Sequence, residues 1–158
     1  VLLPLVKHTN ITLVIAGWAE GKYADEIKET ATAMGIAHLI VMPGAISDEE
    51  KFWLFQNAKA FLFPSLAEGF GMPVVEAMNF GIPVFLSRLT SLPEIGGEQA
   101  FYWDSFEANA MISVLENGLV SFAENNRSKE LLQERAGLFS WQQAAKDYLK
   151  LYDEVLRS

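Results

Sequence analysis

Apolar residues along this chain fall into short uninterrupted runs that alternate with longer segments of helical spacing. Five runs predict β-strands: 11–16, 39–42, 60–63, 83–86 and 100–103. The clearest helical segments are 23–34, 72–79, 104–123, 128–139 and 140–156. Short apolar strands without alternation, separated by helices, are typical of a parallel sheet that is covered on both faces. The pattern therefore predicts a Rossmann-like α/β fold with a doubly wound parallel sheet.

Several helix starts carry a hydroxyl or carboxylate residue three positions before Glu or Gln. Four such pairs occur: Ser47 with Glu50, Ser91 with Glu94, Asp104 with Glu107, and Ser140 with Gln143. In a capping box the first side chain accepts from the backbone N–H three residues on, and the second side chain accepts in return. We therefore expect a capped helix to begin at each pair.

The chain has no repeat, and only 125–127 is linker-like, so we predict one domain over 1–158 that includes the C-terminal helices 128–157. The last helix carries an apolar stripe at helical spacing: Trp141, Ala145, Tyr148, Tyr152 and Val155. We expect most of this stripe to be core, with part of it docking on a domain that is absent from this chain.

Charge and composition exclude several classes of function. Lys and Arg total 12 against 20 Asp and Glu, a net charge of −8, which disfavours a nucleic-acid or anionic membrane surface. There is no cysteine, and no apolar run approaches the ~20 residues that a transmembrane helix needs. The chain starts without Met in mid-pattern, which suggests an excised domain. We expect a cytoplasmic protein that reaches the inner membrane, if at all, only through a missing domain.

The densest chemical signal lies in the glycine-punctuated segment 64–81. Gly69 and Gly71 let the backbone approach a ligand closely, and Pro73 suits the first turn of a helix. The free N–H groups of that helix start favour an anion such as a pyrophosphate. Glu68 and Glu76 flank the anion position, and their carboxylates suit the hydroxyl groups of a sugar and a ribose.

Each glutamate also has an ordinary structural interpretation. Glu76 can be a carboxylate that interacts with the helix dipole, and Glu68 can be a solvated loop residue or half of a capping box with Ser65. The glycine loop, the helix start and the preceding strand end together favour the binding interpretation, because ligands of such sheets bind beyond the carboxyl ends of the strands.

The segment 68–78 followed by 81–84 closely resembles the E-x7-E motif of GT-B glycosyltransferases of family 4. The segments 91–97, 100–102 and 139–152 resemble the following parts of that family, so the resemblance extends from Ile11 to Leu156. It implies the C-terminal, donor-binding half of a GT-B fold, lacking its first strand. It also implies a metal-independent transferase without a cofactor.

The resemblance assigns roles to individual residues. Glu68 is the expected catalytic residue and contacts hydroxyls of the donor sugar, while Glu76 holds the ribose. Backbone N–H groups of the loop meet the sugar or the diphosphate, the base lies near Pro43, and Gly17 with Trp18 faces the phosphates. The expected donor-binding residues are Gly17, Met42, Pro43, Glu68, Gly69, Phe70, Gly71, Met72 and Glu76.

The implied reaction moves a hexosyl group from a UDP- or GDP-hexose to an acceptor, with retention, as in polysaccharide biosynthesis by mannosyltransferase-like enzymes. The family's phosphate-binding Arg and Lys are expected upstream, since neither Lys7 nor Lys22 matches them by position. The acceptor-binding N-terminal domain is absent from this chain, so we expect the fragment alone to be inactive. The alternative is a non-catalytic nucleotide-sugar-binding module or partner subunit.

Other candidates for chemistry are weaker. His8 and His38 have no carboxylate at metal-ligand spacing, so we expect no metal site. Arg88 follows a predicted strand, where its guanidinium could reach a phosphate or sugar, or could equally pair with a surface carboxylate.

Overall fold

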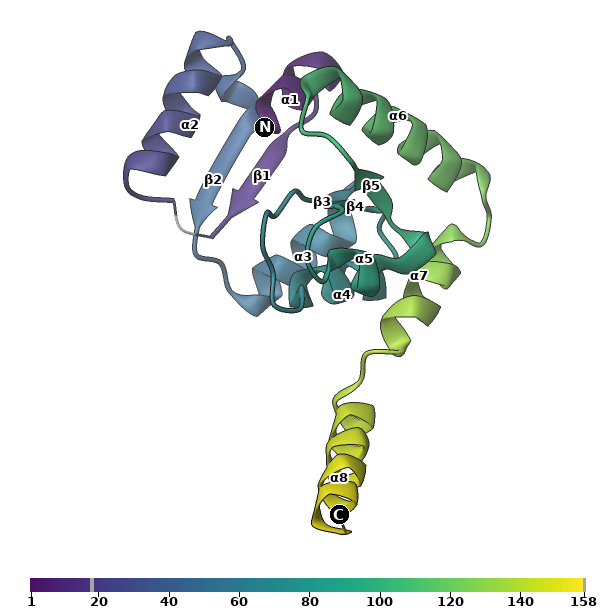
Figure 1. The fold of residues 1–158 in the computed structure, drawn as a ribbon. Helices are drawn as coiled ribbons and strands as arrows, with labels where there is room; N and C mark the ends of the chain where they lie inside the picture. The colour runs from purple at the N-terminus through teal and green to yellow at the C-terminus, as the bar shows by residue number, and fades with distance from the viewer. Residues whose placement is uncertain (18, 158) are drawn as a thin grey trace. The chain divides into compact units, whose positions relative to one another are not determined.

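The structure, a computed structural model, describes residues 1–17 and 19–157, so the expected role of Trp18 lies outside the described residues. The chain forms two compact units, the first comprising 1–58 and 103–117 and the second 59–102 and 118–158. The elements in chain order are α1 (Leu3–Thr9), β1 (Leu13–Ala16), α2 (Lys22–Ala33), η1 (Ala37–Leu39), β2 (Ile40–Gly44), α3 (Asp48–Asn57), β3 (Phe61–Phe63), α4 (Met72–Asn79), β4 (Val84–Ser87), α5 (Leu92–Gly96), η2 (Gly97–Gln99), β5 (Phe101–Trp103), α6 (Ala108–Glu124), α7 (Ser128–Gly137) and α8 (Trp141–Arg157) (Figure 1).

In the first unit, β1 and β2 form a two-stranded parallel sheet. Leu13 pairs with Ile40 in the register, and the register shifts between Val14 and Ala16. A small core of Val6, Ala31 and Ile36 joins α1, α2 and the turn before β2, with Leu13 and Ile40 packed against it. Helix α1 was not among the predicted elements.

The two strands of this sheet are not buried on both faces as the sequence suggested. Exposure alternates along β1 and β2, and Val14 and Val41 are exposed. The expectation that both faces are buried is wrong for this pair of strands. A continuous run of apolar residues does not show whether one face of a strand or both faces are covered.

In the second unit, the strands follow the order β3-β4-β5 in a separate sheet, and β3 is parallel to β4. All four residues of β4 are buried. The α/β class with parallel strands beside helices is confirmed, although the strands form two sheets where the sequence suggested one. The prediction that 1–158 is one nucleotide-sugar-binding domain stays a prediction.

Helices α4 and α5 pack against β4. Val74, Ala77 and Met78 of α4 are fully buried, and α4 packs along α7. The Nε2 of Gln133 in α7 donates to the carbonyl of Asn79 at 2.9 Å, which satisfies an acceptor at the end of α4. The predicted helix 72–79 is thus confirmed at both ends.

The expected capping pairs have different outcomes. Ser47 and Glu50 form the complete box, and the hydroxyl of Ser140 accepts from the N–H of Gln143 at 3.1 Å. The prediction for Asp104 is wrong, since α6 begins only at Ala108. A short helix, α5, begins directly after Ser91 as predicted, but the expected cap is wrong, because the Ser91 hydroxyl bonds elsewhere, as described below.

The expectation that the stripe on α8 is core is wrong. No described residue of α8 is buried, and Trp141, Tyr148, Tyr152 and Val155 are all exposed. Helical spacing shows only that apolar side chains share one face of a helix, and it cannot show what covers that face. Among the described residues, no helix is both long and apolar enough to cross a membrane.

Replacing Gly118 with Ala should destabilise the second unit. A Cβ at this position would lie 2.6 Å from Cε1 of Phe85 and 2.9 Å from Cγ of Phe101, two rings that already stack with centroids 4.9 Å apart. We expect a loss of about 1–3 kcal/mol in the free energy of unfolding, measured by denaturant titration.

The matched control is Gly137→Ala, also at a helical glycine, where an added Cβ meets nothing within 4 Å among the described residues. That variant should be neutral or more stable by up to about 1 kcal/mol. Equal stability of the two variants would contradict the packing around Gly118.

Replacing Ser47 with Ala should remove the box at the start of α3. The N–H of Ser47 donates to Glu50 at 2.8 Å and, with the Ser47 hydroxyl, keeps the pKa of the Glu50 carboxyl below its usual value. This stabilisation is complete above the usual pKa and is lost as pH falls through the lowered pKa. Ser47→Ala keeps the backbone N–H and removes only the hydroxyl, so NMR titration should find the Glu50 pKa raised part of the way toward its usual value. An unchanged pKa would contradict the contribution of the hydroxyl.

Candidate functional site

The expected donor-binding residues fall in both units. Gly17, Met42 and Pro43 belong to the first unit, and the residues from Glu68 to Glu76 belong to the second. In each unit they lie at or beyond the carboxyl ends of parallel strands, where α/β sheets bind their ligands.

In the first unit, the ends of β1 and β2 are joined at two glycines. The N–H of Gly17 donates to the carbonyl of Gly44 at 2.9 Å. Gly17 has φ 132° and Gly44 has φ 86°, which are conformations that other residues rarely adopt. Pro43 is exposed beside this junction. Gly17 and Pro43 are thus solvent-exposed at this end of the sheet, and Gly44 is partly exposed.

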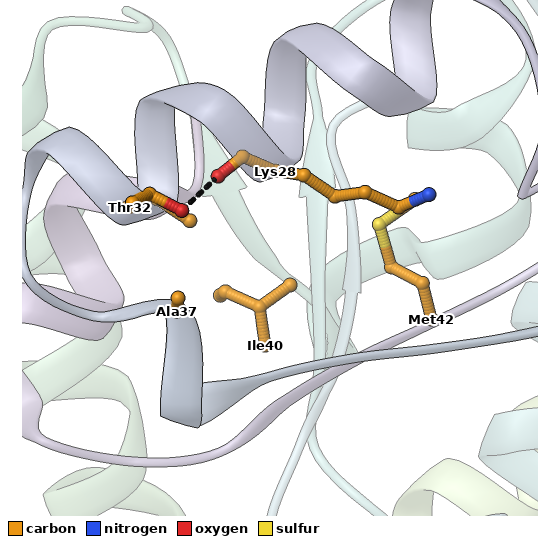
Figure 2. A pocket seen from close by; sticks show the side chains of 6 residues that line it. Lys28, Thr32, Ala37, Ile40 and Met42 are labelled. Atoms are coloured by element: carbon orange, nitrogen blue, oxygen red, sulfur yellow. Dashed lines mark hydrogen bonds between the residues drawn. The ribbon is translucent and has the colours of Figure 1, made fainter.

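The side chain of Met42 lies in a hollow of about 230 Å³ between β2 and α2. Figure 2 shows Met42 and Ile40 extending from β2 toward Lys28 and Thr32 of α2, where the Thr32 hydroxyl donates to the carbonyl of Lys28 at 2.8 Å. Any contact of residue 42 with a nucleotide base would therefore come from its backbone, and the donor-binding role of Met42 stays a prediction.

In the second unit, the start of α4 has the features of an anion site. Gly71 has φ 103°, and a Cβ there would lie 3.1 Å from Cδ2 of Leu92, so the turn suits only glycine. Pro73 stands in the first turn, and the N–H of Val74 donates back to the carbonyl of Gly71 at 2.9 Å. Within the described part of the chain, the N–H groups of Phe70, Gly71 and Met72 donate to no protein acceptor. These three amides can serve a ligand.

The carboxylate of Glu68 is oriented by the loop itself. The hydroxyl of Ser65 donates to Oε1 of Glu68 at 2.7 Å, and Glu68 is half-buried. No helix begins at Ser65, so this contact is not a capping box, and that alternative is wrong. One carboxylate oxygen is thus held by Ser65, which fixes the direction of the other.

The backbone around Glu68 is bound by residues that follow β4. Thr90 Oγ1 accepts from the N–H of Glu68 at 3.1 Å. The hydroxyl of Ser91 donates to the carbonyls of Glu68 and Phe70, at 3.2 and 3.0 Å. Neither role could be predicted from the sequence, because Ser91 fits the spacing of a capping box and no local pattern marks Thr90.

Two further contacts support this loop. The buried hydroxyl of Ser87 donates to the carbonyl of Ser65 at 2.5 Å. The ring of Phe70 meets the ring of Phe139 edge to face, with centroids 5.7 Å apart, and the Arg135 guanidinium lies 5.2 Å from the centre of Phe139. Glu76 lies in the second turn of α4 and is half-buried.

Arg88 lies next to the aromatic ring of Tyr102. This contact does not decide between the two expected roles, binding a phosphate or sugar and pairing with a surface carboxylate. The Arg88 guanidinium lies 4.5 Å from the ring centre of Tyr102, a favourable cation–π distance. The Tyr102 hydroxyl donates to the carbonyl of Gly97 at 2.8 Å. Burial raises the pKa of Tyr102, and the cations Arg88 and Arg135 partly oppose that rise.

The histidines take no part in a metal site within residues 1–17 and 19–157. Nε2 of His8 lies 2.9 Å from Oε1 of Glu116 on the surface of the first unit. No group of three or more His, Cys, Asp or Glu side chains suited to a metal ion occurs in this part of the chain. Independence from metal and cofactor stays a prediction.

The fold and the loop together define a Rossmann-like α/β protein of the GT-B type. Residues 2–134 match the family "Glycosyl transferases group 1". The chain therefore belongs to the glycosyl transferases group 1 family, and this confirms the glycosyltransferase resemblance.

Similar proteins agree with this assignment. The O-antigen chain mannosyltransferase B of Escherichia coli is 30% identical over 155 residues, covering 96% of this chain and 39% of that protein. A glycosyltransferase structure from Rickettsia africae has a TM-score of 0.86 at 16% identity, covering 99% of this chain and 44% of the other. Anabaena HepE in complex with UDP-glucose has a TM-score of 0.81 at 17% identity, covering 96% and 44%. The chain spans less than half the length of the curated relatives it matches.

Replacing Ser87 with Ala should destabilise the loop. The carbonyl of Ser65 would lose its buried donor, and an unsatisfied buried acceptor costs about 1–3 kcal/mol. Denaturant titration should detect this loss in the free energy of unfolding. The matched control, Ser113→Ala, removes an exposed hydroxyl that donates to the carbonyl of Asn109 within α6, and it should be close to neutral. Equal losses would show that the Ser87 contact contributes nothing of its own.

Proposed function

We propose that this chain is the donor-binding half of a glycosyltransferase that uses a nucleotide-diphospho-sugar. The observation that carries the proposal is the segment 68–72, where the amides of Phe70, Gly71 and Met72 at the start of α4 have no protein acceptor among the described residues and Ser65 orients the carboxylate of Glu68. Family membership supports transferase chemistry, and the loop supports a donor that carries both an anion and hydroxyl groups.

The proposed chemistry follows from where charge develops. Transfer of the hexosyl group breaks the bond between the anomeric carbon and the diphosphate oxygen and forms one to an acceptor hydroxyl oxygen, with retention, and the hydroxyl proton passes to the leaving diphosphate. The leaving diphosphate gains negative charge, and the amides of Phe70, Gly71 and Met72 donate to it together with the positive end of α4. Because these donors are fixed before the reaction, they stabilise the leaving group without reorganising. No metal or cofactor is assigned in this scheme.

The two glutamates have separate proposed roles. Glu68 contacts hydroxyls of the transferred sugar, since its second carboxylate oxygen is not the one bound by Ser65. Glu76, one helical turn further from the amides, accepts from the ribose hydroxyls. By the family resemblance, Gly17, Met42 and Pro43 are proposed to contact phosphate and base through backbone groups, and Gly69 is proposed to give the loop its close approach to the donor.

The donor is proposed to be a UDP- or GDP-hexose. The E. coli relative is named as a mannosyltransferase, and the Anabaena structure contains UDP-glucose. The residues that bind the acceptor are proposed to lie in the part of the transferase that this chain does not span. The chain alone is therefore expected to bind the donor without transferring the sugar. Action in the cytoplasm on a polysaccharide acceptor is part of the same proposal.

The test replaces Glu76 with Ala in the complete transferase and measures binding of UDP, GDP and their hexose conjugates by calorimetry. Loss of charge-assisted hydrogen bonds to the ribose should weaken nucleotide binding roughly tenfold or more. Glu124→Ala, which removes an exposed glutamate at the end of α6, is the matched control and should bind as the wild type does. Unchanged affinity in Glu76→Ala would refute the ribose assignment.

A second variant, Glu68→Gln, separates an enzyme from a non-catalytic binding module. It should reduce the rate of hexosyl transfer more than it weakens binding of the bare nucleotide, because Glu68 is proposed to contact the sugar. A wild-type protein that binds nucleotide sugar saturably but transfers to no acceptor would favour the module.

A further inference from the structure

Two hydroxyl groups after β4 bind the backbone of the loop that carries Glu68. Thr90 Oγ1 accepts from the N–H of Glu68, and Ser91 Oγ donates to the carbonyls of Glu68 and Phe70. We refer to Thr90 Oγ1 and Ser91 Oγ together as the hydroxyl clamp. Both lie in the second unit, and they come from positions more than twenty residues along the chain from the groups they bind.

The contacts of Ser91 fix the direction of amides that it does not touch. In a trans peptide the carbonyl of one residue and the N–H of the next lie in one plane and point in opposite directions. Since the Phe70 carbonyl points to Ser91, the Gly71 N–H points away from it. The Glu68 carbonyl orients the Gly69 N–H in the same way. The Gly71 amide, like those of Phe70 and Met72, has no protein acceptor in the described part of the chain.

Thr90 adopts a backbone conformation that is costly for its residue type. Its φ is 51°, in the left-handed region that β-branched residues rarely occupy. Such strain persists only where surrounding structure over-determines it, and it is found most often at functional sites. Glycine or asparagine would fit this backbone with less strain. Glycine would lack the hydroxyl that accepts from the Glu68 N–H, and this contact is what threonine provides at position 90.

We propose that Thr90 and Ser91 are positioning residues of the donor site. Their hydroxyls hold the peptide planes from Glu68 to Gly71 so that the loop amides face the donor diphosphate and the Glu68 carboxylate keeps its direction toward the sugar. The inference rests on the proposed function. It adds two residues whose effect passes through the loop and not through contact with the donor.

Thr90→Gly separates this role from a merely structural one. Glycine relieves the left-handed strain while removing the hydroxyl, so the melting temperature should not fall. Affinity for the donor should nevertheless fall, because the Glu68 N–H loses its acceptor. Thr90→Ser keeps the hydroxyl and should retain donor affinity.

The experiment measures the donor KM, the acceptor KM and the melting temperature of the complete transferase for Thr90→Gly, Thr90→Ser and Ser91→Ala. Thr90→Gly and Ser91→Ala should raise the donor KM about threefold to tenfold, the value of one neutral hydrogen bond, with the acceptor KM unchanged. Thr30→Val is the matched control, because Thr30 is exposed and its hydroxyl donates to the carbonyl of Glu26 within α2. The control and Thr90→Ser should match the wild type.

Hydrogen exchange gives a readout that needs no ligand. The Glu68 amide should exchange faster in Thr90→Gly than in the wild type, and at the wild-type rate in Thr90→Ser. An unchanged exchange rate in Thr90→Gly would overturn the clamp itself.

The outcomes distinguish this inference from the proposed function. A wild-type enzyme that uses the donor, with both variants unchanged in donor KM, overturns the positioning role alone. A donor KM that rises only in step with a falling melting temperature reduces the clamp to a structural contact and also overturns it. A wild-type protein with no affinity for nucleotide sugars overturns the proposed function and the positioning role together.

Discussion

The second unit is organised around the complete burial of β4. Val84, Phe85 and Leu86 are fully buried, so every helix that packs there must present apolar side chains, as α4 does with Val74, Ala77 and Met78. Burial also constrains the one polar side chain of the strand. Ser87 must find an acceptor inside the protein, and it finds the carbonyl of Ser65 at the end of the neighbouring strand segment. The core therefore anchors the beginning of the loop that carries the candidate site.

This anchoring explains how a glycine-rich loop can present amides in defined directions. Glycines allow many conformations, and ordering such a loop costs more entropy than ordering most others. Hydroxyl groups of residues 87–91 form hydrogen bonds with the carbonyl of Ser65, the N–H and carbonyl of Glu68, and the carbonyl of Phe70. The amides left over belong to the residues directly before and within the first turn of α4, where the helix dipole already favours an anion. A few hydrogen bonds thus connect the buried strand β4 to the order of the loop 65–71 and to the direction of its amides.

The first unit contributes a different kind of surface. Its paired strand ends at Gly17 and Gly44 expose backbone, and the Met42 side chain is directed into the hollow beside α2. Backbone groups can bind a ligand without committing a side chain, and solved structures at 16% and 17% identity share the fold of this chain. The match to the glycosyl transferases group 1 family covers residues 2–134 and so includes residues of both units.

The sequence alone determined what local rules can specify. The spacing of apolar residues placed the strands to within about two residues and the helix 72–79 at both ends, because secondary structure depends on near neighbours. The Ser47 box and the glycine loop before α4 were readable for the same reason. The family resemblance could be recognised because the residues 68–84 that carry most of it are nearly contiguous.

Tertiary structure decided what depends on residues distant in the chain. Ser91 has the spacing of a capping residue, but two carbonyls more than twenty residues away take its hydroxyl, and no local pattern records that competition. The exposure of Val14, Val41 and the stripe on α8 likewise depends on which surface each face meets. Thr90 is strained in a conformation that its own sequence disfavours, because a hydrogen bond to a distant residue compensates for the local cost.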